Sequence, residues 1–391
     1  MKLIDRKMLK NFDWLLLAMI SIVVMFGLVI LANASASPYG GDDGAFSFLS
    51  KIDFTYVLLQ MLWYFVGVAA MIVVSLFDYH SVAEIIDWIY WINVGVLAAL
   101  IAFGKVTRGI TGWILIGDRG IQPSELCKIT IIFILAKILS ERLENSGGSL
   151  GWKDIWAVVW RVGIPLVLVM SQPDWGTAAV YIVILAGMLF VAKISYGKIA
   201  IILGSGAALA PVLWAIMADW QRNRILDFLG KTDDATAATK HVEQSKLIIG
   251  SGQLKGRGLF NDGALSRLDY LAEDSTDFIF AVTAESLGFI GGVVLIILYF
   301  FILFRLLYMA TKAKDMFGTL IIIGVMSMML FHVVENIGMT MGMLPVTGIP
   351  LPFFSYGGSS MLTNFLAIGL VQNVLMRRGK KSFNKPVRLN E

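Results

Sequence analysis

The sequence predicts an all-α integral membrane protein with about ten transmembrane helices. Of its 391 residues, 57% are hydrophobic and only 15% are charged, and the mean hydropathy is +0.76. This apolar share exceeds that of ordinary soluble domains. The apolar residues also come in long blocks, close to the roughly 20 residues that a helix needs to cross the hydrocarbon core. Lipid is therefore the expected solvent of most of the chain.

The apolar blocks define the expected helices. The first block is too long for the apolar region of a signal peptide, so we expect it to be a spanning helix. The fourth to sixth are short and are expected to continue into flanking polar residues or to be partly shielded by neighbouring helices. We expect residues 1–391 to form a single polytopic membrane domain. The ten blocks lie at 14–31, 56–76, 85–103, 126–139, 155–170, 177–191, 199–217, 278–303, 319–334 and 361–375.

The distribution of Lys and Arg predicts the orientation. Four of these residues precede the first block and six follow the last, so both termini are expected in the cytoplasm. An even number of helices agrees with this. The segment 218–276, between the seventh and eighth helices, is then a large extracellular loop. Its Gly-rich stretch 247–263 is expected to lie along the membrane surface. The flanking cations are Lys2, Arg6, Lys7, Lys10, Arg377, Arg378, Lys380, Lys381, Lys385 and Arg388.

The composition argues against two kinds of site. The single cysteine, Cys127, excludes an internal disulfide framework and a cysteine-based zinc site. His80, His241 and His332 do not have the spacing of metal ligands. We therefore predict no particular cofactor from the sequence. Whether a divalent cation such as Mg²⁺ or Mn²⁺ assists the reaction is left open.

Four predicted helices run inward from the outer face, and their starts are the candidate site. A helix N-terminus carries unpaired N–H groups and partial positive charge, so four together predict an anion site. Glu125, Asp174 and Asp277 lie at three of the starts. The fourth follows a Pro- and Gly-broken loop, 350–360, that can bring backbone close to a ligand. Ordinary helix capping would also explain each acid taken alone.

Three further side chains are candidates. Lys128 shares a helix face with Glu125 and lies within a spanning segment, where a cation is costly unless it is paired or faces a polar cavity. A structural ion pair is the alternative. Trp113 and Arg108 lie in one loop, where Trp113 is either an interfacial anchor or a substrate contact. Asp277 lies at the boundary of water and lipid, where it could accept a proton from a sugar hydroxyl or simply cap its helix.

Five motifs resemble those of the shape, elongation, division and sporulation (SEDS) family, and they occur in family order over nearly the whole chain. They are the Gln-Pro-Ser-Glu sequence at 122–125, Gln-Pro-Asp at 172–174, Gln-Ser-Lys with Ile-Gly-Ser-Gly at 244–252, Thr-Asp-Phe-Ile-Phe at 276–280, and the stretch 344–360 that ends in Ser-Tyr-Gly-Gly-Ser-Ser. Five such motifs on a ten-helix frame are highly specific.

The resemblance implies a peptidoglycan glycosyltransferase that joins lipid II and a growing lipid-linked glycan outside the bacterial cytoplasmic membrane. It implies that Asp277 is the essential aspartate, that Glu125, Lys128 and Asp174 belong to a central cavity, and that Trp113 is functionally important. From the loop 350–360 we add Ser355, Gly357, Gly358 and Ser359 as substrate contacts, together with Arg108.

The resemblance also implies partners, namely a class B penicillin-binding protein and other membrane proteins of the elongation complex, and no nucleic acid. The short tails favour the elongation type, RodA, over the division type, FtsW. Two readings from other classes stay open. A flippase for lipid-linked precursors would also have many helices and a polar interior, and a non-catalytic scaffold would tolerate the loss of Asp277.

Overall fold

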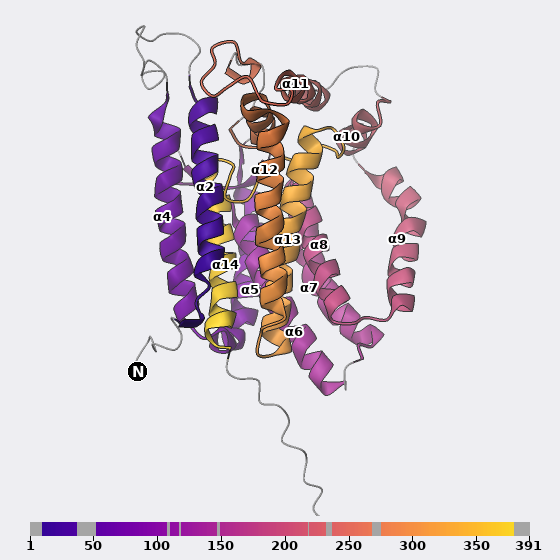
Figure 1. The fold of residues 1–391 in the computed structure, drawn as a ribbon. Helices are drawn as coiled ribbons and strands as arrows, with labels where there is room; N and C mark the ends of the chain where they lie inside the picture. The colour runs from indigo at the N-terminus through magenta and orange to yellow at the C-terminus, as the bar shows by residue number, and fades with distance from the viewer. Residues whose placement is uncertain are drawn as a thin grey trace, which may run out of the picture.

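The computed structural model describes residues 10–36, 52–107, 110–116, 119–146, 149–217, 219–231, 237–267 and 275–378. Within these residues, each of the ten predicted apolar blocks corresponds to one helix. All of these helices except that of block 199–217 pack into one bundle, and that helix stands apart at its side (Figure 1). The helices are α2 (Trp14–Ala34), α4 (Phe54–Leu76), α5 (Tyr79–Phe103), α6 (Pro123–Asn145), α7 (Trp152–Met170), α8 (Trp175–Val191), α9 (Tyr196–Ile216), α12 (Ile279–Ala310), α13 (Met316–Thr340) and α14 (Gly358–Met376).

Six of the described helices, α2, α4, α5, α12, α13 and α14, are long and apolar enough to cross a membrane by length and composition alone. Two of the three short predicted blocks, the fourth and the fifth, are extended by polar residues as expected, whereas the sixth gains only Trp175 and Gly176 and stays a 17-residue helix. The fourth block becomes the 23-residue helix α6, which begins at Pro123 and ends at Asn145. Its ends carry charged and polar side chains, so hydropathy alone underestimates its length.

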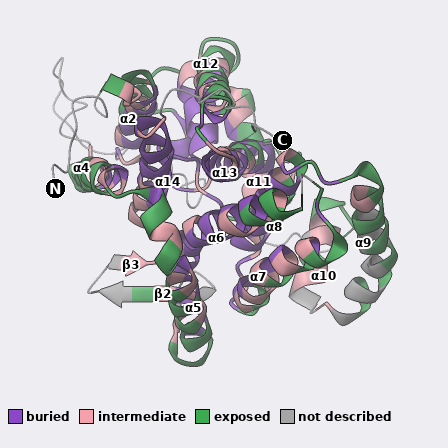
Figure 2. Ribbon diagram, turned by 90° about the horizontal axis from the view of Figure 1, so that it is seen from below, coloured by how far each residue is buried: buried purple, intermediate pink, exposed green. Residues whose placement is uncertain are grey.

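The centre of the bundle consists of α6, α13 and α14, whose residues are largely buried (Figure 2). The outer helices α4 and α5 expose apolar side chains, including Leu58 at 62% and Ile92 at 64%. A soluble protein rarely exposes so much contiguous apolar surface. These outer faces are therefore the surfaces that contact lipid.

Both described ends of the chain lie at one end of the bundle, called here the tail end. Asp13, before α2, accepts a hydrogen bond from Arg305 of α12 at 2.6 Å, and its backbone N–H donates to Gln372 of α14 at 2.9 Å. The helices α10 (Asp219–Phe228) and α11 (Ala237–Ser251) lie at the opposite end, the loop end (Figure 1). The predicted orientation requires this arrangement of the ends.

A small antiparallel sheet lies between α5 and α6, and the all-α prediction missed it. Its order is β1 (Lys105–Thr107), β2 (Ile110–Ile116) and β3 (Arg119–Ile121). Trp113 faces Lys105 across one pair of strands, and Leu115 faces Gly120 across the other. Strands of three to seven residues are too short for a period of two to stand out beside apolar blocks.

The Gly-rich stretch 247–263 packs against α12 at the loop end, with much of its surface exposed. Its first residues end α11, and the following residues form hydrogen bonds with the backbone of α12. Arg257 N–H donates to Glu285 O at 2.8 Å, and Phe289 N–H donates to Gln253 O at 2.8 Å. These bonds are possible because α12 is broken at Gly288, which has φ 69° and ψ −166°.

Glu285 holds the same segment from inside α12. Its fully buried carboxylate accepts hydrogen bonds from Leu265 N–H at 2.7 Å, Ser266 N–H at 3.0 Å and the Ser251 hydroxyl at 3.2 Å. Leu265 begins the 3₁₀ turn Leu265–Arg267. A buried carboxylate with several such donors is strongly stabilised. Glu285 therefore has a structural role and is not available as a base.

We expect Gly288→Ala to destabilise the protein. An added Cβ would lie 2.3 Å from Gly256 N and 2.5 Å from Leu254 O, and the backbone conformation at residue 288 is itself unfavourable for a side chain. The expected cost is at least ~1–3 kcal/mol, measured as a lower melting temperature in detergent and faster tryptic cleavage after Lys255 or Arg257. In the control Gly95→Ala, the new Cβ meets nothing within 4 Å. Equal melting temperatures for the two variants would contradict this role of the helix break.

Candidate active site

A cavity of about 600 Å³ lies at the loop end, where four helices begin. Its walls combine segments that are far apart in the sequence. Its lining residues include Trp113 of β2, Gln122 and Glu125 at the start of α6, Asp174 and Thr177 at the start of α8, Thr276 and Asp277 before α12, Gly348 and Pro350 after α13, and Gly357, Gly358 and Ser359 at the start of α14. The structure thus brings the four predicted helix starts together.

Asp277 is held in the cavity wall by its neighbours. The adjacent Phe278 is buried in an apolar cluster with Ile248 and Ala281. The Asn336 side-chain amide donates to the backbone carbonyls of both Asp277 and Ile349, each at 2.8 Å. These contacts fix the backbone from which the Asp277 carboxylate projects into the cavity.

The backbone also leaves space for this carboxylate. Gly348 has φ 72°, and a Cβ built on it would lie 3.3 Å from Asp277 Oδ2. Gly348 is therefore suited to this wall in two respects, since it tolerates the left-handed conformation and leaves room beside the carboxylate.

Asp174 links the starts of α6 and α8. One of its oxygens caps α8 by accepting from Thr177 N–H at 3.0 Å. The other accepts from the Gln122 amide at 2.8 Å and from the Ser124 hydroxyl at 3.3 Å. The capping explanation is therefore correct for Asp174, and the same side chain also lines the cavity. Three donors hold this buried carboxylate in place, so it acts as a positioning group.

Lys128 lies behind Glu125 and does not line the cavity. Its ammonium donates to Glu125 Oε1 at 2.5 Å and contacts His332 Nε2 at 3.1 Å, and all three side chains are buried. His332 Nδ1 is 3.3 Å from Pro350 O. Since Lys128 can only donate, this arrangement requires a neutral His332 whose proton is on Nδ1. The other Glu125 oxygen is buried and has no hydrogen-bond partner among the described residues.

The loop before α14 divides into supporting and lining residues. Ser355 is buried outside the cavity lining, where its hydroxyl accepts from Leu351 N–H at 2.8 Å and its carbonyl accepts from the Gln60 amide at 2.9 Å. The expectation that Ser355 contacts substrate directly is therefore replaced by a role in holding the loop. Gly357, Gly358 and Ser359 do line the cavity. Ser359 Oγ accepts from Gln122 N–H at 3.2 Å.

Trp113 projects from β2 into the cavity wall and packs over Gly120, where a Cβ would lie 2.6 Å from the indole ring. Its indole N–H is buried and has no hydrogen-bond partner among the described residues. A buried unpaired donor beside a cavity is suited to a polar ligand group. Arg108, the other candidate in this loop, lies outside the described residues.

The electrostatic character of the cavity comes from carboxylates and helix ends. The starts of α6, α12 and α14 have no side-chain cap in the described part of the chain, and each contributes the partial positive charge of a helix N-terminus to this end of the bundle. No Lys or Arg is among the described lining residues. The described residues also contain no group of three or more His, Cys, Asp or Glu placed to hold a metal.

Two residues of this site were missed or left undecided by the sequence. The sequence shows His332 only as one of three histidines without ligand spacing, and it leaves Asn336 open between a polar helix contact and a place in the cavity. Both are polar side chains inside an otherwise apolar helix, which is the available signal, because such residues are rare in spanning segments unless they are functional or paired. Their actual partners, Lys128 and Asp277, are distant in the sequence.

A protein-family model described as a cell cycle protein, FTSW_RODA_SPOVE, matches residues 13–380. This chain belongs to the FtsW/RodA/SpoVE, or SEDS, family. It is 36% identical over 299 residues to the peptidoglycan glycosyltransferase MrdB of Escherichia coli K12, covering 74% of this chain and 78% of that protein. It is 33% identical over 375 residues to stage V sporulation protein E of Bacillus subtilis 168, covering 93% and 96%.

Solved structures agree with the fold of this SEDS protein. One comes from work on the structural coordination of polymerization and crosslinking by a peptidoglycan synthase complex. It matches with a TM-score of 0.77 and 26% identity, covering 94% of this chain and 99% of that one. The rod shape determining protein RodA of Thermus thermophilus matches with a TM-score of 0.67 and 25% identity, covering 94% and 97%. The predicted family and the helical, multi-pass membrane fold are confirmed.

We expect the buried pair Glu125 and Lys128 to be stable only when both charges are present. Lys128→Met leaves a buried carboxylate unpaired, and the expected loss is ~3–5 kcal/mol. The double variant, with Glu125→Gln added, should recover most of the melting temperature in detergent. Arg142→Met is the control, because it breaks an exposed ion pair with Asp154 and should cost under ~1 kcal/mol. A double variant as unstable as the sum of the single variants would show that the two charges are not coupled.

Proposed function

We propose that this SEDS peptidoglycan glycosyltransferase polymerises lipid II into glycan strands on the extracellular side of the bacterial cytoplasmic membrane, with both termini in the cytoplasm. The observation that carries the proposal is the meeting of four helix starts, Asp277 and Trp113 around one cavity at the loop end. Cations flank the tail end, which supports a cytoplasmic location for it. Segment 218–276 is then the large extracellular loop.

In this proposal, Asp277 is the general base. The 4-hydroxyl of the acceptor's GlcNAc attacks C1 of the donor's MurNAc while Asp277 takes the hydroxyl proton. The new C1–O bond forms as the bond from C1 to the diphosphate oxygen breaks, and undecaprenyl diphosphate leaves with that electron pair. Direct displacement inverts the α-linked donor to a β-1,4 product, without a covalent sugar–enzyme intermediate.

The departing diphosphate needs positive potential, which the lining side chains do not supply. Lys128 is neutralised by Glu125 and lies behind it. The uncapped starts of α6, α12 and α14 are therefore the proposed stabilising groups. Fixed backbone dipoles act strongly on developing charge where water is excluded. No step is assigned to a metal ion.

The remaining lining residues are proposed to bind the saccharides. The Trp113 indole can donate to a sugar oxygen and stack on a sugar face. The unpartnered Glu125 oxygen can accept a hydrogen bond from a hydroxyl. Gly357 and Gly358 allow the sugar to approach the backbone, and Ser359 and Asp174 hold the α6 and α8 starts around it. Lys128 acts through Glu125.

We assign the elongation role and a class B penicillin-binding protein as the cross-linking partner. The elongation role is supported by the similarity to the rod shape determining protein RodA of Thermus thermophilus. The partnership is supported by the similar solved structure, which comes from a complex that coordinates polymerization and crosslinking. Other membrane proteins of the elongation complex are further expected partners.

A lipid-linked-precursor flippase is the main alternative function. A carrier needs access from both faces, whereas the acids and broken loops of this chain gather at the loop end. Glycan polymer formed from lipid II by the purified chain in detergent, where there is no membrane to cross, would exclude obligate transport. Product is read on a gel, with and without the cross-linking partner.

We expect Asp277→Asn to abolish strand synthesis, because an amide cannot accept the hydroxyl proton. The fold should persist, since the amide and carboxylate have similar size. The measurement is gel-resolved glycan from purified lipid II, alongside the melting temperature. Asp53→Asn is the control, because this exposed residue caps α4 through an oxygen that asparagine also provides. Wild-type synthesis by Asp277→Asn would refute the base assignment, and a non-catalytic scaffold would also tolerate it.

We expect Asn336→Ala to lower kcat by about 10- to 100-fold with little change in KM, because a catalytic group displaced by about 1 Å loses rate on this scale. The variant removes the hydrogen bonds to Asp277 O and Ile349 O. Steady-state kinetics with lipid II provide the readout. The matched control is Asn93→Ala, which removes hydrogen bonds to Ile89 O and Thr130 within the bundle. Equal kinetic losses in both variants would indicate a general packing effect.

A further inference from the structure

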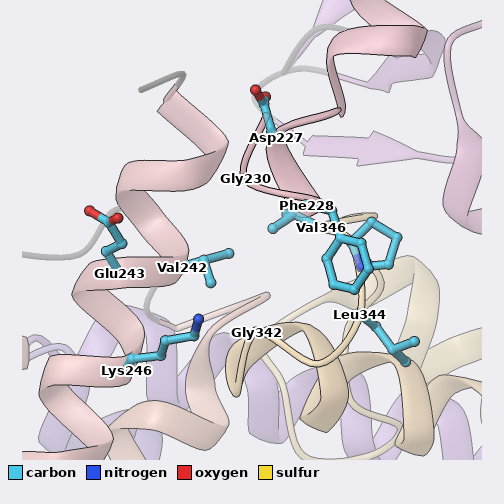
Figure 3. Close-up of a pocket in the computed structure, with 10 residues that line it drawn as sticks. Asp227, Phe228, Gly230, Val242, Glu243, Lys246, Gly342, Leu344 and Val346 are labelled. Carbon is cyan, nitrogen blue, oxygen red and sulfur yellow. The ribbon is translucent and has the colours of Figure 1, made fainter. Parts of the chain in front are cut away.

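We propose that a second pocket, beside the catalytic cavity, binds the stem peptide of the muramyl substrate; this inference rests on the proposed function. The pocket has a volume of about 230 Å³ and lies between the end of α10, one face of α11 and the loop that follows α13 (Figure 3). Val346 lines both this pocket and the cavity that contains Asp277. The two sites are therefore neighbours that share one wall.

Lys246 is the cation of this pocket. Its side chain extends from α11 toward Gly342 (Figure 3). A Cβ on Gly342 would lie 2.1 Å from Lys246 Cε and 2.5 Å from Nζ, and Gly342 has φ 70°. Glycine at this position therefore leaves the space that the lysine occupies. Lys246 makes no hydrogen bond or ion pair with a described residue, so its ammonium is available to an anionic ligand.

The rest of the pocket is mixed in character. Val242, Leu344 and Pro345 provide apolar walls, and Glu243 places a carboxylate at the rim, next to Val242 on α11. A ligand that fits has a carboxylate for Lys246, small apolar groups for the walls and a polar or cationic part near the rim. The stem peptide of lipid II combines these features, because it contains alanine residues, free carboxylates and a side-chain amine.

The covalent structure of the substrate supports the same assignment. The stem peptide is attached through the lactyl group at C3 of the muramic acid, and the reacting carbon is C1 of the same ring. A sugar placed with C1 near Asp277 therefore carries its peptide only a ring's width away. Phe278, the residue after Asp277, packs with Val346 in the wall between the two sites. The larger cavity receives the sugars and the smaller pocket receives the peptide.

The test uses the full chain in detergent with two substrates: lipid II carrying its pentapeptide, and lipid II whose stem is trimmed to the first alanine as its carboxamide, which has no free carboxylate. Lys246→Gln should raise KM for the pentapeptide substrate about fivefold, the scale of one exposed charge pair, with unchanged kcat. It should leave KM for the trimmed substrate unchanged. Lys240→Gln, on the same helix outside the pocket lining, is the control and should alter neither.

A parallel titration with soluble muramyl pentapeptide reads binding without turnover. Wild type should bind it about fivefold more tightly than Lys246→Gln does. An equal KM increase for both lipid II substrates would identify the diphosphate as the ligand of Lys246 and overturn the proposal. Unchanged KM and unchanged peptide binding in Lys246→Gln would overturn it as well. Peptide binding that depends on Lys246, in a chain that forms no polymer, would support the pocket and refute the proposed polymerase.

Discussion

Inside a lipid bilayer, backbone N–H and C=O groups must find their hydrogen-bond partners within the protein, and the loop end of this bundle is built around that requirement. Helix α12 is broken at Gly288, and the freed backbone groups pair with the segment around Gln253 and Arg257. The loop before α14 is held by the Gln60 side chain. Non-helical backbone is accommodated here because its N–H and C=O groups find hydrogen-bond partners within the protein.

The packing at the loop end also gives two carboxylates different surroundings. Glu285 and Asp277 lie two helical turns apart near the start of α12. Glu285 is fully buried and takes three hydrogen bonds from the docked segment, so its capacity to accept is committed to structure. Asp277 is placed by backbone contacts from Asn336 and projects into the cavity wall. The two acids are of similar chemistry, and their surroundings differ: one is fully buried, and the other lines the cavity.

The charged groups of the site lie in two layers, one at the cavity and one behind it. Carboxylates and uncapped helix starts face the cavity, while the only buried ammonium described here, on Lys128, lies behind Glu125 and is held between it and His332. A buried ion pair is costly to assemble and costlier to break. Such a pair fixes the first turn of α6 in one arrangement. The negative charge that develops on a departing diphosphate would then meet backbone dipoles, whose positions do not change during the reaction.

The sequence alone determined the helices and the residue types at their starts, because both are local properties. The length of an apolar block sets a spanning helix, and helix-start chemistry sets acids such as Asp174 and Asp277 in place. Only the tertiary structure decided which side chains share the cavity. Ser355 and Ser359 are four residues apart, yet one supports the loop and the other lines the site. That division, the short β2 hairpin and the bonds of Asn336 depend on contacts between segments far apart in the chain, which local patterns do not encode.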